Sequence, residues 1–498
     1  MMRAPARSLP HSAVSIQLKK AFFAVPMAAL LCALPLAAHV GSPDVFYEGE
    51  AGPYHLLVTI RPPQVIPGVA EIEIRSSSKD VQQVRIVPLR LTGPGAKNAP
   101  VPDVAQRSPY DQQFYTGSLW LMNTGAWQVR VQADGAQGPG MLSVPVPAVA
   151  TRVLPMQKGL AAILVVLGLV LFIGLVSIIG AGSREAQLEP GAEPDGPHVR
   201  RSRIAMAATA VVLLGTMWLG SMWWNSEATA YQGKLFKPLE LKASVEDGDR
   251  LALRLIDPGW LNRRTDDLLP DHNHLMHLYV LRIPAMDLVW HLHPERTGDD
   301  TFAQSLPSMP AGRYALYGDI VHENGLSETA VGQMEIAAIN GQPLEGDDAA
   351  GAAAPLEKAD YNSVVSPLSD GYRMVWERGP MPYRARKPYE FRFRVEDSQG
   401  RPAEGMELYM GMQGHAAFVR TDRSVFAHTH PSGSVPMAAL SLIADSNPHA
   451  GHDMMHGEPP ALVSFPFGFP KAGEYRIIVQ VKRAGNVETG IFDTRVEN

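Results

Sequence analysis

The chain of 498 residues has a single cysteine, Cys32, which lies in an apolar segment near the N-terminus. That segment, residues 21–38, follows four basic residues and ends in a small-residue cleavage site after Ala38. This order is typical of a secretory signal peptide, which we predict over residues 1–38, with an uncleaved signal anchor as the alternative. Without this segment the mature chain has no cysteine, which excludes disulfides and thiolate chemistry.

Long basic runs are also absent, and the net charge is -6. A nucleic-acid-binding surface needs a positive footprint, so we expect no nucleic-acid partner. The sequence also lacks a Gly-x-Ser-x-Gly nucleophile elbow, a phosphate-binding loop ending in Lys-Ser/Thr, and a His-Glu-x-x-His helix. These absences do not exclude catalysis, but they leave a non-enzymatic role as the expectation.

Two long apolar runs, residues 159–180 and 204–224, each approach the ~20 residues that a helix needs to cross a bilayer. The connector, residues 181–203, carries four arginines, so the positive-inside rule makes it cytoplasmic. We therefore expect a transmembrane hairpin in the bacterial inner membrane, with the N- and C-terminal regions in the periplasm. A pair of buried core helices is the alternative.

The remaining sequence consists of short segments separated by Pro-Gly turns. Residues 69–75 and 127–131 alternate apolar and polar side chains, as half-buried strands do. We predict a mainly β protein with three immunoglobulin-like or cupredoxin-like β-sandwich domains plus the two-helix transmembrane hairpin. The expected domains cover residues 39–150, 234–338 and 371–498, and a Gly/Ala/Asp-rich linker at 341–355 joins the last two.

One histidine pattern occurs twice in the last two of these domains. It runs from His277 to His291, Leu292, His293 and Pro294, and again from His415 to His428, Thr429, His430 and Pro431. Each copy predicts a strand, a tight turn and a second strand. Antiparallel partners keep a constant index sum, so a three-residue loop at 284–286 sets Tyr279 opposite His291 and His277 opposite His293. A two-residue turn at Asp422-Arg423 likewise sets Ala417 opposite His428 and His415 opposite His430.

The predicted hairpins gather imidazoles on one patch of sheet, because cross-strand Cβ atoms lie ~4.5–5.5 Å apart and residues i and i+2 share a face. Such a patch suits a metal ion, although hydrogen-bonded core or edge histidines remain the alternative. The candidate ligands are His277, His291, His293, His415, His428 and His430. Further candidates lie around the hairpins: His272, His274, Met412, Met437, His449, His452 and His456.

Histidine mixed with thioether sulfur favours copper as the bound metal. Zinc is the main competitor among other divalent metals, but structural zinc sites rely on cysteine, which the mature chain lacks. Any single methionine also has the alternative role of filling a gap in a hydrophobic core.

Both copies resemble the YtkA-like group of exported bacterial domains, small β-sandwiches associated with heavy-metal and copper handling. The resemblance is carried by residues 275–278 with 291–295, and by residues 411–415 with 428–431. It implies the fold and the export of these domains more than a biochemical role. Ser432 follows the second Pro where Glu295 follows the first, so the two sites need not bind a metal equally.

We therefore expect a membrane-anchored protein that holds copper for storage, sensing or delivery, with a periplasmic or inner-membrane protein as a further partner. A second hypothesis is a tethered immunoglobulin-like scaffold whose histidines bind no metal. A third is a copper oxidase or monooxygenase that chelates copper through an N-terminal His39. That arrangement needs more histidines in the same domain, where the sequence offers His55.

Overall fold

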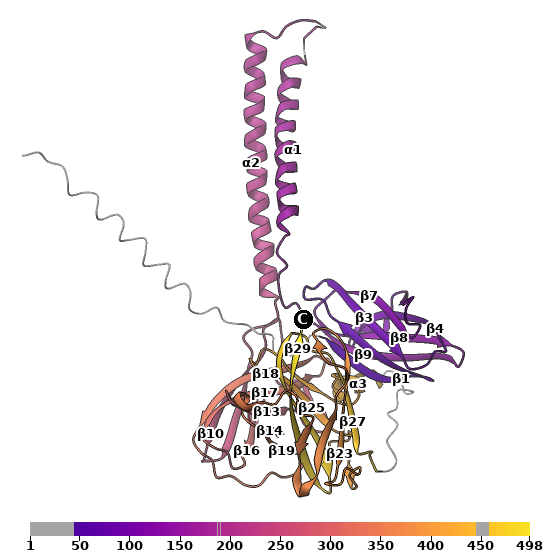
Figure 1. Cartoon of the computed structure of the whole chain (residues 1–498). Helices are drawn as coiled ribbons and strands as arrows, with labels where there is room; N and C mark the ends of the chain where they lie inside the picture. The colour runs from indigo at the N-terminus through magenta and orange to yellow at the C-terminus, as the bar shows by residue number, and fades with distance from the viewer. Residues whose placement is uncertain (1–43, 187, 190, 445–457) are drawn as a thin grey trace, which may run out of the picture. The chain divides into compact units, whose positions relative to one another are not determined.

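The computed structural model describes residues 44–186, 188–189, 191–444 and 458–498 (Figure 1). The chain is mainly β, with several sheets and two long apolar helices, which confirms the predicted class at this level. The proposed signal peptide, His39, and the tract with His449, His452 and His456 lie outside the described residues.

The N-terminal region contains two antiparallel sheets. In the first the order is β1 (Val45–Ala51), β2 (Tyr54–Arg61), β3 (Gly68–Ser76), β7 (Phe114–Leu121) and β6 (Gln106–Arg107). In the second it is β5 (Asp103–Val104), β4 (Val81–Arg90), β8 (Gly125–Gly135) and β9 (Gly138–Ala148), with the short helix η1 (Pro94–Lys97) after β4. Alternate residues of β3 are buried, as predicted, and Ile72 shares one core with Val84 and Val144 of the second sheet.

The two helices are α1 (Lys158–Glu185) and α2 (Gly196–Gly233), and both are long and apolar enough to cross a membrane. They run side by side (Figure 1), and the Ser202 hydroxyl donates a hydrogen bond to the Gly180 carbonyl at 2.7 Å. Helix α2 begins before the apolar run, because Asp195 caps its N-terminus by accepting from the His198 N–H. The expected loop is therefore shorter than 181–203, and its later arginines are helical.

The middle region has one large sheet whose strand order is β15-β16-β11-β10-β18-β17-β13-β14-β19, with β12 paired to β17. Its strands are β10 (Glu240–Glu246), β11 (Arg250–Ile256), β12 (Leu268–Leu269), β13 (His277–Ile283), β14 (Leu288–Leu292), β15 (Glu295–Arg296), β16 (Thr301–Ser305), β17 (Gly312–His322), β18 (Ser327–Ile336) and β19 (Ala349–Ala352). Strand β19 lies within the expected linker 341–355, so part of that segment is a strand paired with β14 rather than a free connector.

The C-terminal region has two sheets, ordered β20-β21-β23-β27 and β22-β29-β28-β25-β26, with β24 paired to β28. Its elements are η2 (Leu356–Lys358), β20 (Val365–Pro367), η3 (Ser369–Gly371), β21 (Arg373–Glu377), β22 (Tyr383–Arg384), β23 (Tyr389–Glu396), β24 (Met406–Glu407), β25 (His415–Arg420), β26 (Phe426–Thr429), α3 (Met437–Ala444), β27 (Leu462–Phe467), β28 (Gly473–Arg483) and β29 (Asn486–Glu497). The region begins before the expected boundary at 371, because β20 pairs with β21.

The two histidine-bearing hairpins share a hydrophobic cluster. Side chains of β13, β14 and β17 pack there against side chains of β25, β26, β28 and β29. At its centre the ring of Tyr317 stacks on Phe426 with centroids 4.4 Å apart. Strands β13 and β25 are consequently buried along almost their whole length, on both faces. This shared core places the two copies of the histidine pattern next to each other.

Candidate metal centre

The register predicted for both hairpins is confirmed within the strands, but the pairing ends one residue before the expected pairs of His277 with His293 and of His415 with His430. Tyr279 pairs with His291 in β13–β14, and Ala417 pairs with His428 in β25–β26. The second turn is wider than predicted: the Arg420 N–H donates to the Val425 carbonyl, so four residues connect the strands. The constant index sum survives because this turn widens by one residue on each side.

Eight of the described histidines meet in one continuous cluster at this junction. They are His272, His274, His277, His291, His293, His415, His428 and His430, and contacting rings have centroids from 4.1 to 6.4 Å apart. The two copies face each other, since the ring of His277 lies parallel to that of His415 at 6.4 Å. The sequence predicted two sites in separate domains, whereas the structure brings both sets of imidazoles together.

Three of these rings form the group that we name the middle triad: His277, His291 and His293. One ligand nitrogen of each lies within 4.8 Å of the others. Strand β13 supplies the first ring, strand β14 the second, and the residue after β14 the third. This set is the one predicted from the first copy of the pattern.

Each ring of the middle triad donates its outer N–H to an oxygen. His277 Nε2 lies 3.0 Å from the Asp271 carbonyl, and His291 Nδ1 lies 2.8 Å from Gln480 Oε1. His293 Nδ1 lies 3.0 Å from Asp348 Oδ1. Because these oxygens only accept, the proton of each neutral ring is fixed on the outer nitrogen. The inner nitrogens are therefore left with lone pairs.

The inner nitrogens converge. His277 Nδ1 and His291 Nε2 lie 3.3 Å apart, and two lone pairs at that distance cannot form a hydrogen bond. Two nitrogens bound at ~2.0–2.1 Å to one ion in near-tetrahedral geometry would lie ~3.3–3.5 Å apart. The third inner nitrogen, His293 Nε2, is buried and has no hydrogen-bond partner among the described residues. The first two nitrogens are therefore spaced as two ligands of one cation, and His293 offers a ligand nitrogen within 4.8 Å of both rings' ligand nitrogens.

Burial keeps these imidazoles neutral. It lowers the pKa of His277 and of His291 well below the ordinary value, and the neighbouring histidines lower both further. Burial also lowers the pKa of His293, although the Asp348 carboxylate opposes the drop. Neutral imidazole is the form that binds metal ions.

A second group, which we name the bridging triad, consists of His272, His415 and His430. Their ligand nitrogens also lie within 4.8 Å of one another. His272 belongs to the middle region, but its Nδ1 donates to the carbonyl of Met410 in the C-terminal region at 2.8 Å. Its Nε2 has no partner among the described residues, and neither ring nitrogen of His415 has one.

The bridging triad differs from the set predicted for the second copy, because His272 takes the place expected for His428. A tight turn with left-handed residues at His272 and Asn273 carries the first ring across to the C-terminal region. The ring of His428 is drawn aside by the Asp319 carboxylate, which lies 3.4 Å from its Nδ1. It lies between the triads, with ring centroids 5.4 Å from His277 and 4.8 Å from His430.

The less certain candidates have different surroundings. The ring of His274 contacts that of His293 in a tilted arrangement with centroids 4.1 Å apart, and it lies 3.3 Å from the Asp347 carboxylate. The backbone of Met412 closes the turn before β25 by pairing with Tyr409. Met437 packs against the core of the N-terminal region, where it fills space rather than accompanying a triad.

Sequence reasoning missed the three oxygens that orient the middle triad, those of Asp271, Asp348 and Gln480. Two of them gave a usable signal. Gln480 interrupts the otherwise apolar run at residues 477–481, where a buried amide needs a partner. Asp348 belongs to an acidic pair in a segment that looked like a linker.

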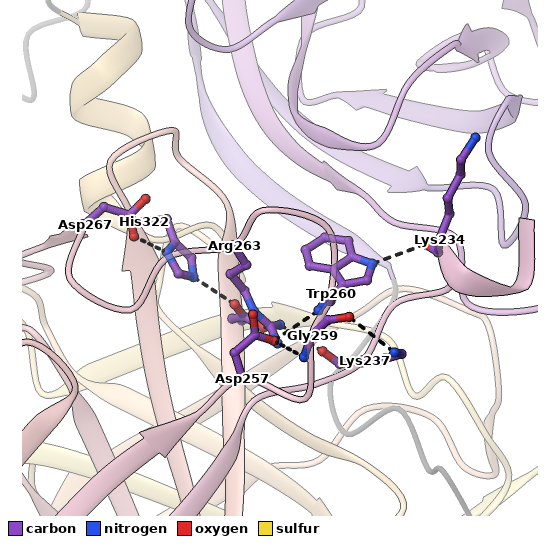
Figure 2. A network of polar contacts seen from close by, with 9 residues as sticks. Lys234, Lys237, Asp257, Gly259, Trp260, Arg263, Asp267 and His322 are labelled. Carbon is purple, nitrogen blue, oxygen red and sulfur yellow. Dashed lines mark hydrogen bonds and ion pairs between the residues drawn. The ribbon is translucent and has the colours of Figure 1, made fainter. Parts of the chain in front are cut away.

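A histidine outside the cluster shows the opposite arrangement. Both nitrogens of His322 are occupied, by Asp267 Oδ1 at 2.7 Å and Glu328 Oε1 at 2.8 Å, and Arg263 also binds Glu328 (Figure 2). Burial alone would lower the pKa of His322, but the two carboxylates outweigh it and raise the pKa. Figure 2 shows this network continuing from Arg263 to Asp257. Such a saturated histidine holds the fold together and has no nitrogen left for a metal.

His55 in the N-terminal region is likewise paired. Its ring lies 2.7 Å from Glu48 and 2.8 Å from Glu50, on the β1–β2 hairpin. The hydrogen bond to Glu48 makes the largest contribution to raising the pKa of His55 to about 9. The ring is therefore protonated at neutral pH rather than available as a ligand.

One family model matches the C-terminal part of the chain. Residues 365–498 match the model of a family described as a domain of unknown function, DUF8832. The match begins at the first residue of β20, which agrees with the observed start of the C-terminal region. No curated protein matches the chain. The resemblance to YtkA-like domains stays a prediction.

Among solved structures, the chain is similar to a mutant alpha-2-macroglobulin from Salmonella at 8% identity and a TM-score of 0.19, with 91% of this chain and 23% of that chain covered. The native alpha-2-macroglobulin of E. coli is 9% identical with a TM-score of 0.19, and the match covers 93% of this chain and 23% of that chain. Latent PorU from Porphyromonas gingivalis is 8% identical with a TM-score of 0.13, and the match covers 92% of this chain and 34% of that chain. The chain thus spans 23% to 34% of the length of these proteins, and scores this low do not define a shared fold.

Proposed function

We propose that this protein holds a transition metal, copper, through the buried histidine cluster, for storage, sensing or delivery. The observation that carries the proposal is the middle triad: the outer nitrogen of each ring lies at hydrogen-bonding distance from an oxygen, and one ligand nitrogen of each ring lies within 4.8 Å of the other two. Outer-shell acceptors of this kind fix the tautomer of metal-binding histidines and orient their rings. The saturated surroundings of His322 show that the chain satisfies a buried histidine fully where no ligand is needed.

The donor set favours copper over zinc. Three neutral imidazoles suit both ions, but divalent copper binds nitrogen ligands more tightly than zinc in the Irving–Williams order. Since Met437 packs against the core of the N-terminal region, this preference rests on the imidazoles rather than on thioether sulfur. We assign a holding role because the candidate ligands are buried: His277, His291 and His293 are 2%, 0% and 7% exposed.

The proposal includes the placement of the chain. Helices α1 and α2 would anchor it in the bacterial inner membrane, and the arginines between the two apolar runs would place the β regions in the periplasm. Each β region would be an immunoglobulin-like or cupredoxin-like sandwich. The shared core of the two sheets in the N-terminal region supports that assignment for the first one.

The test is metal titration of the detergent-solubilised full chain after metal removal. We expect tight binding of Cu(II), with nitrogen hyperfine structure in its electron paramagnetic resonance spectrum, and weaker binding of Zn(II). Changing His277, His291 and His293 to Ala together should remove the middle-triad ion. The matched control is His55→Ala, which removes an imidazole outside the cluster.

The outcomes are distinct. Tighter binding of zinc than of copper would overturn the choice of metal and keep the holding role. Absence of tight binding for both metals, or binding that the triple variant leaves unchanged, would overturn the proposal. The protein would then be a tethered β scaffold.

A further inference from the structure

The bridging triad takes its ligands from two parts of the chain. His272 comes from the middle region, whereas His415 and His430 come from the C-terminal region. We propose that this triad is a second metal site, and that the ion bound there locks the middle and C-terminal regions together. The inference rests on the proposed function, since it extends the same chemistry to a site between regions.

The first support is the unsatisfied state of these rings. His415 is 0% exposed and both of its nitrogens lack a partner among the described residues, as does His272 Nε2. His430 is 3% exposed, and although the backbone of Val435 approaches its ring, neither ring nitrogen makes a hydrogen bond of normal geometry with the described residues. Buried polar atoms are almost always satisfied, so several unsatisfied nitrogens around one point indicate a ligand. A cation could bind one nitrogen of each of the three rings.

The second support is reciprocity between the regions. The middle triad depends on Gln480 of the C-terminal region to orient His291, and Gln480 is the strand partner of His415. The bridging triad in turn depends on His272, whose ring is oriented by the Met410 carbonyl. Separation of the two regions would therefore break the bridging triad and leave His291 without its acceptor. An ion that binds only the docked state stabilises docking by mass action.

The N-terminal region contributes to the same site by holding the loop after His430. The Glu48 N–H donates to the Ser432 carbonyl at 2.8 Å, and the Ser434 N–H donates to the Phe46 carbonyl at 2.9 Å. Strand β1 approaches so closely that a Cβ atom on Gly433 would lie 2.0 Å from the Phe46 oxygen. All three β regions thus take part in forming the bridging triad.

The experiment measures stoichiometry and domain locking in the detergent-solubilised full chain, with Cu(II) and Zn(II) each added alone. The wild type should bind two equivalents. His272→Gln should bind one, because the amide still donates to the Met410 carbonyl but supplies no imidazole. His293→Ala should also bind one, and the control His55→Ala should keep two.

Hydrogen exchange provides the readout of locking. In the wild type the second equivalent should slow exchange of amides in the facing strands β13 and β25 by at least tenfold, and in His272→Gln it should not. Circular dichroism confirms that each variant is folded.

Two results would overturn the inference: two equivalents retained in His272→Gln, or a second equivalent that leaves exchange in both strands unchanged. A wild type that binds one ion, lost in His293→Ala, would overturn the second site and leave the proposed function standing. Failure of the wild type to bind either metal would overturn both.

Discussion

Arg476 holds the interface on which the histidine cluster depends. Its guanidinium, 1% exposed, forms a forked ion pair with Asp493 at 2.8 and 2.9 Å. The same group donates to the carbonyls of Met286 at 2.7 Å and Ala354 at 2.9 Å, both outside the C-terminal region. We predict that Arg476→Met destabilises the docked pair of regions far more than any exposed arginine would.

The magnitude follows from what the variant leaves behind. Asp493 is 8% exposed, and removal of one partner from a buried ion pair costs about 3–5 kcal/mol. The two carbonyls lose a charged donor, which water replaces only in part, so the total is on the order of 5 kcal/mol. For a unit of this size each kcal/mol lowers the melting temperature by roughly 2–4 °C, giving a drop of about 10–20 °C.

The assay is thermal unfolding of the metal-free full chain in detergent, followed by tryptophan fluorescence. Arg476→Lys keeps the positive charge but cannot form the two parallel hydrogen bonds to the carboxylate, so we expect an intermediate drop in melting temperature. The matched control is Arg495→Met, which breaks the pair between an exposed arginine and Glu474 and should cost less than about 1 kcal/mol. Melting curves that coincide for the two methionine variants would refute the role assigned to Arg476.

Three further predictions concern single side chains. His322→Gln should lower the free energy of unfolding by about 3 kcal/mol at pH 6, measured by the denaturation midpoint. Because the folded-state pKa of His322 is raised, its ion pairs contribute fully below ~6.5 and are lost as the pH rises through the folded value. The difference in stability between wild type and variant should therefore shrink along a series of increasing pH, and a difference that stays equal would contradict this. Gly433→Val should lower the melting temperature by several degrees, because its side chain would meet the Phe46 carbonyl and the φ of 119° is unfavourable for valine; an unchanged melting temperature would rule out that strain. Tyr279→Phe removes a buried hydroxyl without a partner among the described residues, so stability should stay within about 1 kcal/mol, and a larger loss would reveal a partner for the hydroxyl.

The hairpins could be predicted from sequence because their determinants are local. Residues 277–293 and 415–430 each contain two strand-forming runs around a turn, and the spacing of the histidines fixes the register once the turn is centred. The apolar runs that became α1 and α2 were equally clear. The ends of these helices were less clear, because Asp195 extends α2 through polar residues by capping it.

The joint histidine cluster could not be predicted in the same way, since it depends on which surface of the middle region packs against which surface of the C-terminal region. One local signal was present: β13 and β25 are apolar on both faces, whereas a strand at a solvated surface alternates. That pattern implies that the second face of each strand is buried, but it does not identify the part of the chain that packs there. The exchange of His428 for His272 required the positions of Asp319 and Met410, each of which is far in sequence from the histidine that it contacts.

The burial of the cluster has a consequence for the release of a bound ion. His415 and His291 are both 0% exposed, whereas His272 is half-buried, and we predict that an ion leaves either triad when the two regions separate. Release and undocking are then one equilibrium, and any change that weakens docking should speed release. Transfer of bound metal to an excess of a strong chelator, followed by stopped flow, should therefore be at least tenfold faster in Arg476→Met than in Arg495→Met. Equal transfer rates would show that the ion has a path that does not require the two regions to separate, and the cluster would then be a site with its own entrance rather than one closed by the docking of the two regions.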